Sequence, residues 1–264
     1  MFLNAKEKKI TQEYLDNGFI IRPVADKKAL KLIHKDIIHF TEKILNLKCT
    51  IDYKEWLNRI HEKVPVEKLN EFRLEMISCI NAKTDFRLRY FYLARHLLDT
   101  IVGNELAMQL RLNLSIQQPL DDSSLLPVHA DTWSGDSPFE VVVWLPLVDC
   151  FGTKSMYIIL PGKNKELNAN FDNLAGSSSE SLFQSIAQNV QWLEVPFGHV
   201  VLFNQGLPHG NRVNQEKETR WSLNCRFKGV FTPYGDKKLG EFFEPITLRA
   251  ASRGGMTYEF PEVL

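Results

Sequence analysis

The first hundred residues show apolar side chains recurring every three or four positions, which is the period of an α-helix. We expect four helices in this part of the chain, at 11–18, 26–47, 66–79 and 85–100. The first should begin with Thr11 as its N-cap and end at Gly18, and a brief strand should follow at 19–21. The pattern therefore predicts a helical layer over 1–105.

After residue 105 the pattern changes to the alternation of apolar and polar positions that is typical of half-buried strands. Strands are expected at 108–117, 139–148, 155–160, 191–195, 199–204 and 220–230. Pro and Gly separate them, and many short strands with such breaks are typical of a sandwich or barrel. The sequence has no internal repeat and no obvious linker. We expect one domain, 1–264, mainly β with α, with a barrel core over 106–235, an insertion at about 163–190 and a C-terminal tail over 236–264.

The composition is that of an ordinary soluble globular protein, with 44% hydrophobic and 24% charged residues. Lys plus Arg equals Asp plus Glu at 32 each, so no overall field favours nucleic acid or an anionic membrane. No apolar run approaches the length of a membrane span, and the chain starts without the apolar core of a signal peptide. The four cysteines lack CxxC spacing. We expect a reduced cytoplasmic enzyme that acts on a small molecule, with no nucleic acid partner.

Candidate metal chemistry lies in His129-Ala130-Asp131 and in His209, about eighty residues later. Two imidazoles and one carboxylate on one face can hold Fe(II) and leave coordination positions open. A His-x-Asp triplet alone is weak, because His34-Lys35-Asp36 repeats it inside an expected helix, where residues i and i+2 point about 200° apart. His129 and Asp131 follow an extended segment, in which i and i+2 project to the same side. His209 follows an apolar strand and is expected in a turn.

The expected strand 220–230 begins with a clean alternation that places four polar side chains on one face: Arg220, Ser222, Asn224 and Arg226. Arg220 and Ser222 can together bind the carboxylate of an organic acid that chelates the same iron. We predict that Arg226 binds an anionic group of the substrate, such as a phosphate or a uronate. An internal ion pair is the alternative interpretation of Arg226.

Several segments, in this order, resemble the phytanoyl-CoA dioxygenase-like family of Fe(II)/2-oxoglutarate oxygenases. They are the triplet at 129–131, Val-Val-Val-Trp-Leu-Pro-Leu-Val-Asp at 141–149, Leu-Pro-Gly at 160–162, and Gly-His-Val-Val-Leu-Phe at 198–203 leading into His209. The eleven-residue step from His209 to Arg220 matches the family's spacing. The likeness covers nearly the whole chain and is strongest over 128–227. Residues 209–236 are similar, more narrowly, to a branch found in bacterial surface-carbohydrate gene clusters.

The resemblance implies a double-stranded β-helix, a jelly-roll barrel wrapped by helices. It also implies roles for single residues: His129, Asp131 and His209 as iron ligands, Arg220 as the partner of the distal 2-oxoglutarate carboxylate, and Trp144 packed near this cosubstrate. Polar residues before the triplet usually help to hold 2-oxoglutarate in the family, and Asn113, Gln117 and Gln118 are the candidates here. Asn211, two residues after the distal histidine, is expected to make a further polar contact.

The activity that the resemblance implies is oxidation by O2 of a substrate, coupled to conversion of 2-oxoglutarate to succinate. Hydroxylation is the commonest outcome in the family, and desaturation or epimerisation also occurs. We expect a small polar substrate such as a carbohydrate or nucleotide-sugar derivative. Two alternatives stay open: a non-redox, cupin-like sugar epimerase or isomerase, and a metal-free binding barrel. Neither needs Arg220 and Ser222 to bind a keto acid.

Overall fold

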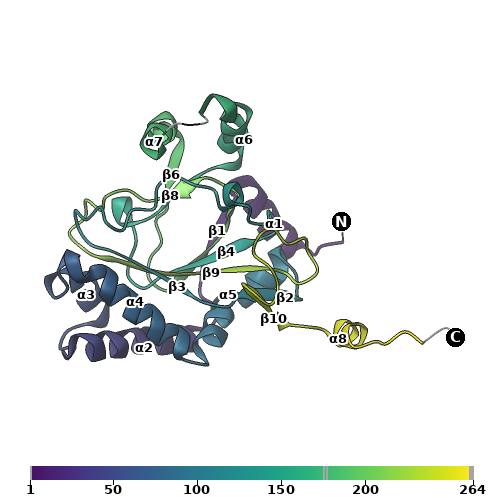
Figure 1. The fold of residues 1–264 in the computed structure, drawn as a ribbon, viewed down its shortest axis with the longest axis horizontal. Helices are drawn as coiled ribbons and strands as arrows, with labels where there is room; N and C mark the ends of the chain where they lie inside the picture. The colour runs from purple at the N-terminus through teal and green to yellow at the C-terminus, as the bar shows by residue number, and fades with distance from the viewer. Residues whose placement is uncertain (1, 175, 177, 262–264) are drawn as a thin grey trace.

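Two antiparallel sheets form the centre of the protein, which a computed structural model describes for residues 2–174, 176 and 178–261 (Figure 1). The larger sheet has the order β1 (Phe19–Pro23), β7 (His199–Asn204), β4 (Val141–Pro146), β9 (Arg220–Gly229), β2 (Leu106–Gln109), β10 (Phe243–Thr247), and β3 (Asn113–Gln117) also pairs with β9. The smaller sheet has the order β6 (Val190–Trp192), β5 (Tyr157–Ile159), β8 (His209–Gly210). The expected jelly roll with surrounding helices is confirmed.

The segment expected as one strand at 108–117 is in fact two strands, β2 and β3, and the prediction was wrong in this respect. Between them the chain leaves the sheet: the amide of Leu112 donates to Oδ1 of Asn81 at 2.8 Å, a side chain rather than a neighbouring strand. Both strands then pair with the same edge of the long strand β9. The break lets β3 continue beside the first half of β9, with Ser115 opposite Ser222. This register places the polar faces of two strands side by side.

The helices cover the outer face of the larger sheet, where the apolar residues of β9 are buried. The main ones are α2 (Lys27–Leu45), α4 (Val66–Ala82) and α5 (Phe86–Ile101), with the short helix α3 (Tyr53–Asn58) beside them. Trp221 of β9 packs edge-on against Phe72 of α4, and its indole NH donates to the carbonyl of Leu57 at 3.0 Å. Tyr90 of α5 donates to the carbonyls of Val143 and Leu223. The polar residues of β9 consequently face the interior of the barrel.

Several boundaries differ from the sequence expectations. Helix α1 (Ala5–Asn17) begins six residues before Thr11, because Asn4 and Glu7 form a reciprocal capping box. It ends at Gly18 as predicted, in the left-handed conformation with φ 75°. Helix α3 was not predicted, since six residues carry too little periodicity. The region expected as an insertion contains α6 (Pro161–Ala169) and α7 (Ser179–Ile186), which form a lobe at the top of Figure 1.

The region expected as a C-terminal tail contributes the edge strand β10 and ends in α8 (Ala250–Met256), which points away from the body in Figure 1. Short 3₁₀ turns connect other elements at Ile60–Glu62, Asp131–Ser134, Gly152–Lys154, Phe171–Leu174 and Ala187–Asn189. Among the residues described, no helix combines the length and the apolar character that crossing a bilayer requires.

Candidate metal and cosubstrate site

His129 and His209 lie directly opposite each other on neighbouring segments of the smaller sheet. The amide of His129 donates to the carbonyl of His209 at 3.0 Å, and the amide of His209 donates back at 2.8 Å. Residues paired in this way carry their side chains on the same face, and the two rings are 4.4 Å apart between centroids. His209 was expected in a turn and instead belongs to the short strand β8. The backbone pairing fixes both imidazoles toward one point.

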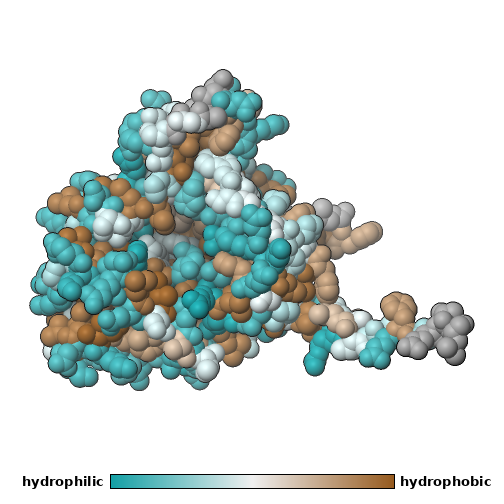
Figure 2. Space-filling view, in the orientation of Figure 1, coloured by the Kyte–Doolittle hydropathy of each residue, from teal (hydrophilic) through white to brown (hydrophobic). Residues whose placement is uncertain are grey.

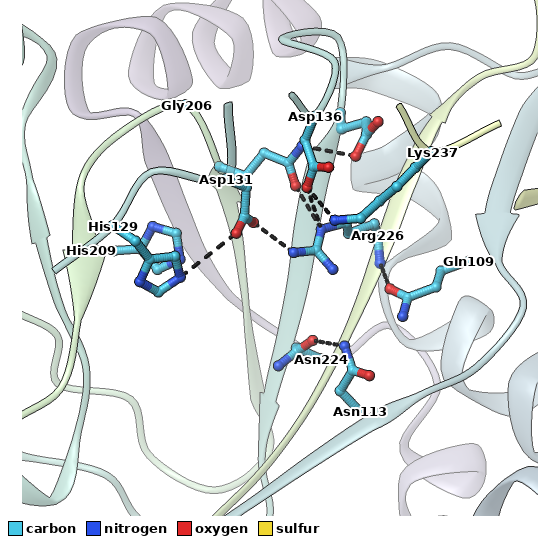
Figure 3. A network of polar contacts seen from close by, with 12 residues as sticks. Gln109, Asn113, His129, Asp131, Asp136, Gly206, His209, Asn224, Arg226 and Lys237 are labelled. Atoms are coloured by element: carbon cyan, nitrogen blue, oxygen red, sulfur yellow. Dashed lines mark hydrogen bonds and ion pairs between the residues drawn. The ribbon is translucent and has the colours of Figure 1, made fainter. Parts of the chain in front are cut away.

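Asp131 completes the group because Ala130 has extended backbone angles, φ −116° and ψ 133°. Asp131 therefore projects to the same side as His129, as its sequence spacing predicts. One Nε2–Oδ1 distance, from His129 to Asp131, is 3.6 Å, and one ligand atom from each of the three residues lies within 4.8 Å of the others. Figure 3 shows both rings side by side with the carboxylate of Asp131 directed toward them. The residues can hold one metal ion.

Both histidines are oriented by the chain that precedes them. Nδ1 of His129 lies 2.7 Å from the carbonyl of Pro127, and Nδ1 of His209 lies 2.9 Å from the carbonyl of Leu207. A carbonyl only accepts, so each Nδ1 carries a proton, and in the neutral form of either ring Nε2 then presents the lone pair. Burial and the neighbouring imidazole of His129 lower the pKa of His209 well below its usual value. His209 is therefore neutral near pH 7, which is the form that binds metals.

The second triplet takes no part in this site. His34 is buried on α2 and stacks at 4.9 Å on Phe197, while Asp36 pairs with Arg89 at 2.7 Å. The helical backbone separates the two side chains, as expected.

Arg220 is a buried cation with spare hydrogen-bonding capacity. Its side chain is anchored by the carbonyl of Ser155, 3.1 Å from Nη1, and by Oγ of Ser115, 2.8 Å from Nη2. Among the residues that the structure describes, its Nε has no hydrogen-bond partner, and neither has the buried Oγ of Ser222 two residues along the same face. Burial lowers the pKa of Arg220 to about 10. Buried donors without acceptors cost stability, so an anion that accepts from both groups fits this place.

One cavity of about 480 Å³ contains both groups of residues. Its lining includes His129, Asp131 and His209 as well as Arg220 and Ser222. Figure 2 shows this face of the molecule hollowed between the α6–α7 lobe and the body. The volume is in the range of small-molecule sites. A chelating acid can thus reach the metal ligands and Arg220 from the same space.

Some of the other residues predicted to contact the cosubstrate line the cavity, and some do not. Trp144 and Asn113 line the cavity, and Nδ2 of Asn113 donates to Oδ1 of Asn224 at 2.9 Å. Asn211 also lines it and binds the backbone amide of Leu126 at 2.6 Å. Their contact with 2-oxoglutarate stays a prediction.

Gln117 and Gln118 are outside the cavity lining. Gln117 donates to the carbonyl of Arg212 at 2.6 Å, and Gln118 donates to that of Val64 at 2.8 Å. Ser115, which holds Arg220 and lines the cavity, was missed by the sequence reasoning. The signal was present, because Ser115 follows Asn113 by two positions on the same face of the expected strand.

Arg226 lines the cavity and is already paired with acidic side chains. Its Nη2 lies 2.9 Å from Oδ2 of Asp131, and its Nε donates to Oε1 of Gln205 at 2.9 Å and lies 3.6 Å from Oδ2 of Asp136. The internal ion pair considered as the alternative is therefore present. Contact between Arg226 and a substrate stays a prediction.

The sequence matches no protein-family model and no curated protein. Three solved structures show similar folds. EctD from S. alaskensis, with 2-oxoglutarate and 5-hydroxyectoine, is 15% identical with a TM-score of 0.55, covering 88% of this chain and 78% of that one. ThoJ, a non-haem monooxygenase in a nickel complex, is 11% identical with a TM-score of 0.52, covering 92% and 85%. HygX from Streptomyces hygroscopicus, with nickel and 2-oxoglutarate, is 14% identical with a TM-score of 0.51, covering 90% of each chain.

These comparisons establish the fold. The chain shares its jelly-roll architecture with these proteins, and its own residues place a His-Asp-His group and a buried arginine in one cavity.

Proposed function

We propose that this protein is an Fe(II)- and 2-oxoglutarate-dependent oxygenase that uses O2. One observation carries the proposal: the His-Asp-His group shares its cavity with Arg220, a buried guanidinium whose Nε has no acceptor in the described part of the chain. 2-Oxoglutarate has a keto acid at one end and a second carboxylate at the other, which matches these two features. When bound, iron and 2-oxoglutarate supply an oxidant for the substrate, and 2-oxoglutarate is converted to succinate and CO2.

The chain's own residues would bind and orient the reactants. The carbonyls of Pro127 and Leu207 hold the two imidazoles with Nε2 toward the metal. Arg226 forms an ion pair with Oδ2 of Asp131, which leaves Oδ1 available as a metal ligand. Arg220 and Ser222, both buried, would bind the distal carboxylate.

The finer parts of the proposal follow from the resemblance in the sequence. They are membership of the phytanoyl-CoA dioxygenase-like family, affinity with its surface-carbohydrate branch, hydroxylation as the outcome, and a cytoplasmic location. All four cysteines are free thiols, which supports a reducing compartment. A non-redox epimerase has no need of a keto acid, and a metal-free barrel has no need of the His-Asp-His group. The combination of that group with Arg220 in one cavity therefore supports the oxygenase over both.

Anaerobic addition of Fe(II) and 2-oxoglutarate to the purified protein tests the proposal directly. We expect the weak visible charge-transfer absorption of an iron-bound keto acid, and Fe(II) with succinate in place of 2-oxoglutarate is the matched control, since succinate lacks the keto group. In air, slow succinate formation should follow even before the substrate is known. Absence of both signals would sink the proposal.

The charged residues that line the cavity indicate which charge the substrate should carry. Its lining carries Arg73, Arg220, Arg226 and Asp131, which with neutral imidazoles amounts to two positive charges. Fe(II) and the 2-oxoglutarate dianion cancel each other, so two positive charges would remain in the loaded site. Such a site favours an anion. Within the proposed carbohydrate class, this supports a phosphate-bearing nucleotide sugar over a neutral sugar.

Arg73 of α4 is the cation best placed to meet that anion. Within residues 2–174, 176 and 178–261, the one side-chain partner of its guanidinium is the neutral Asn70, at 2.7 Å. We expect nucleotide sugars, and not the corresponding neutral sugars, to stimulate succinate formation. For a substrate found this way, Arg73→Met should raise KM by roughly ten- to a hundredfold, the loss of one charge-assisted hydrogen bond. The 2-oxoglutarate concentration that gives half the maximal rate should not change. Lys68→Met, on the exposed side of the same helix, is the control; equal effects from both would contradict the assignment.

A further inference from the structure

A chain of ion pairs runs behind the metal-binding carboxylate (Figure 3). Oδ2 of Asp131 lies 2.9 Å from Nη2 of Arg226, and Nε of Arg226 lies 3.6 Å from Oδ2 of Asp136. The same oxygen of Asp136 lies 2.5 Å from Nζ of Lys237. Lys237 follows β9 by eight residues and is far from the metal ligands in sequence. Lys237 is nevertheless connected to Asp131 by ion pairs, with Asp136 and Arg226 between them.

The backbone brings Lys237 to this position. The amide of Asp236 donates to the carbonyl of Gly135 at 3.1 Å, and Oγ of Ser137 donates to the carbonyl of Pro233 at 2.6 Å. The two segments approach so closely that a Cβ at Gly235 would lie 2.2 Å from the carbonyl oxygen of Gly135. Only glycine fits at Gly235. The segment 233–237 is therefore joined to the loop that follows Asp131.

Arg226 stands between two carboxylates that compete for it. Asp131 and Asp136 are both largely buried, with side chains 10% and 2% exposed. In such surroundings an unpaired carboxylate attracts a nearby guanidinium strongly. Lys237 neutralises Asp136, so that Arg226 remains on Asp131. Gln205 fixes the guanidinium from a third side, and its amide is held in turn by the buried Glu140 at 2.8 Å.

We propose that Lys237 is a positioning residue of the metal centre: by holding Asp136 it keeps Arg226 on Oδ2 of Asp131, which leaves Oδ1 as the single ligand oxygen. The inference rests on the metal site of the proposed function and adds to it the segment after β9. It assigns Lys237 and Asp136 a role that neither the metal-ligand pattern nor the cavity lining indicates.

Calorimetric titration with Co(II), without 2-oxoglutarate, tests the inference in the full chain. Lys237→Met should weaken Co(II) binding by about tenfold, the lower end of the range for residues that orient metal ligands. The double variant Lys237→Met/Asp136→Asn should restore it to within about twofold of wild type, because the competing carboxylate is removed together with its partner. Lys237→Arg should bind as wild type. Lys238→Met removes the same charge from the exposed neighbouring residue and should have no effect.

The double variant separates positioning from simple anchoring. If Lys237 only ties segment 233–237 to the loop, the double variant will bind Co(II) as weakly as the single one, and the inference is lost. It is lost equally if Lys237→Met binds as wild type. Thermal unfolding without metal checks that each variant folds. A wild-type protein that binds Co(II) but gives neither the keto-acid absorption with Fe(II) nor succinate would overturn the oxygenase proposal and leave this one standing, whereas a protein that binds no metal overturns both.

Discussion

Replacement of His209 by alanine is expected to weaken metal binding by more than about a hundredfold and to abolish succinate formation. In the proposed site His209 would supply one of three protein ligands, and removal of a ligand costs more than the ten- to a hundredfold typical of residues that only orient ligands. The backbone pairing with His129 uses main-chain atoms and survives the substitution. We therefore expect a folded apoprotein with near-normal unfolding temperature, measured beside Co(II) affinity by calorimetry.

The matched control for His209→Ala is His34→Gln, which changes the histidine of the second His-x-Asp triplet. Because His34 and Asp36 are held apart on helix α2, Co(II) affinity should stay at the wild-type value. A metal affinity that falls with His34→Gln and survives His209→Ala would place the metal elsewhere and refute the site.

Replacement of Arg220 by methionine is expected to change function and stability in opposite directions. Affinity for 2-oxoglutarate should fall by at least roughly a hundredfold, because a buried charge-assisted contact to its carboxylate is lost. Co(II) affinity should be unaffected. The apoprotein should be as stable as wild type or more stable, since a buried cation lacking an anionic partner is replaced by an apolar side chain of similar length.

Two measurements check this prediction: anaerobic titration of the iron-loaded protein with 2-oxoglutarate, and thermal unfolding without ligands. Arg220→Lys is the informative companion, because it keeps the positive charge but loses the planar fork, and it should bind 2-oxoglutarate with intermediate affinity. If the Arg220→Met variant bound 2-oxoglutarate with wild-type affinity, the distal carboxylate would have to bind another group. The shared cavity of Arg220 and the His-Asp-His group would then no longer support the proposed function.

The parts of the site that were predicted from sequence depend on local backbone geometry. The alternation along β9 assigns Arg220 and Ser222 to the inner face because strand residues alternate strictly, and the extended step from His129 to Asp131 follows the same rule. The false triplet at His34 was rejected for the corresponding reason in a helix.

The parts that escaped prediction depend on contacts between distant segments. For Arg226 an internal ion pair was one of two interpretations, but its partners Asp131 and Asp136 could not be named from the sequence, since they lie about ninety residues away along the chain. The break between β2 and β3 likewise depends on a hydrogen bond from Leu112 to Asn81, which no periodicity shows. The start of α1 is a different case, because the Asn4–Glu7 capping box was visible in the sequence and Thr11 was preferred to it.

The reciprocal backbone bonds between His129 and His209 give the protein a reporter of metal occupancy that needs no substrate. An ion held by both imidazoles would cross-link the two segments that these bonds already join. A ligand that binds only the closed form lowers the population of the open form by the factor 1 + [L]/Kd, so exchange of these two amide protons with solvent should slow as metal is added. Isotope exchange at His129 and His209 would thus measure iron loading at the ligands themselves, in the presence or absence of 2-oxoglutarate and in variants that turn nothing over.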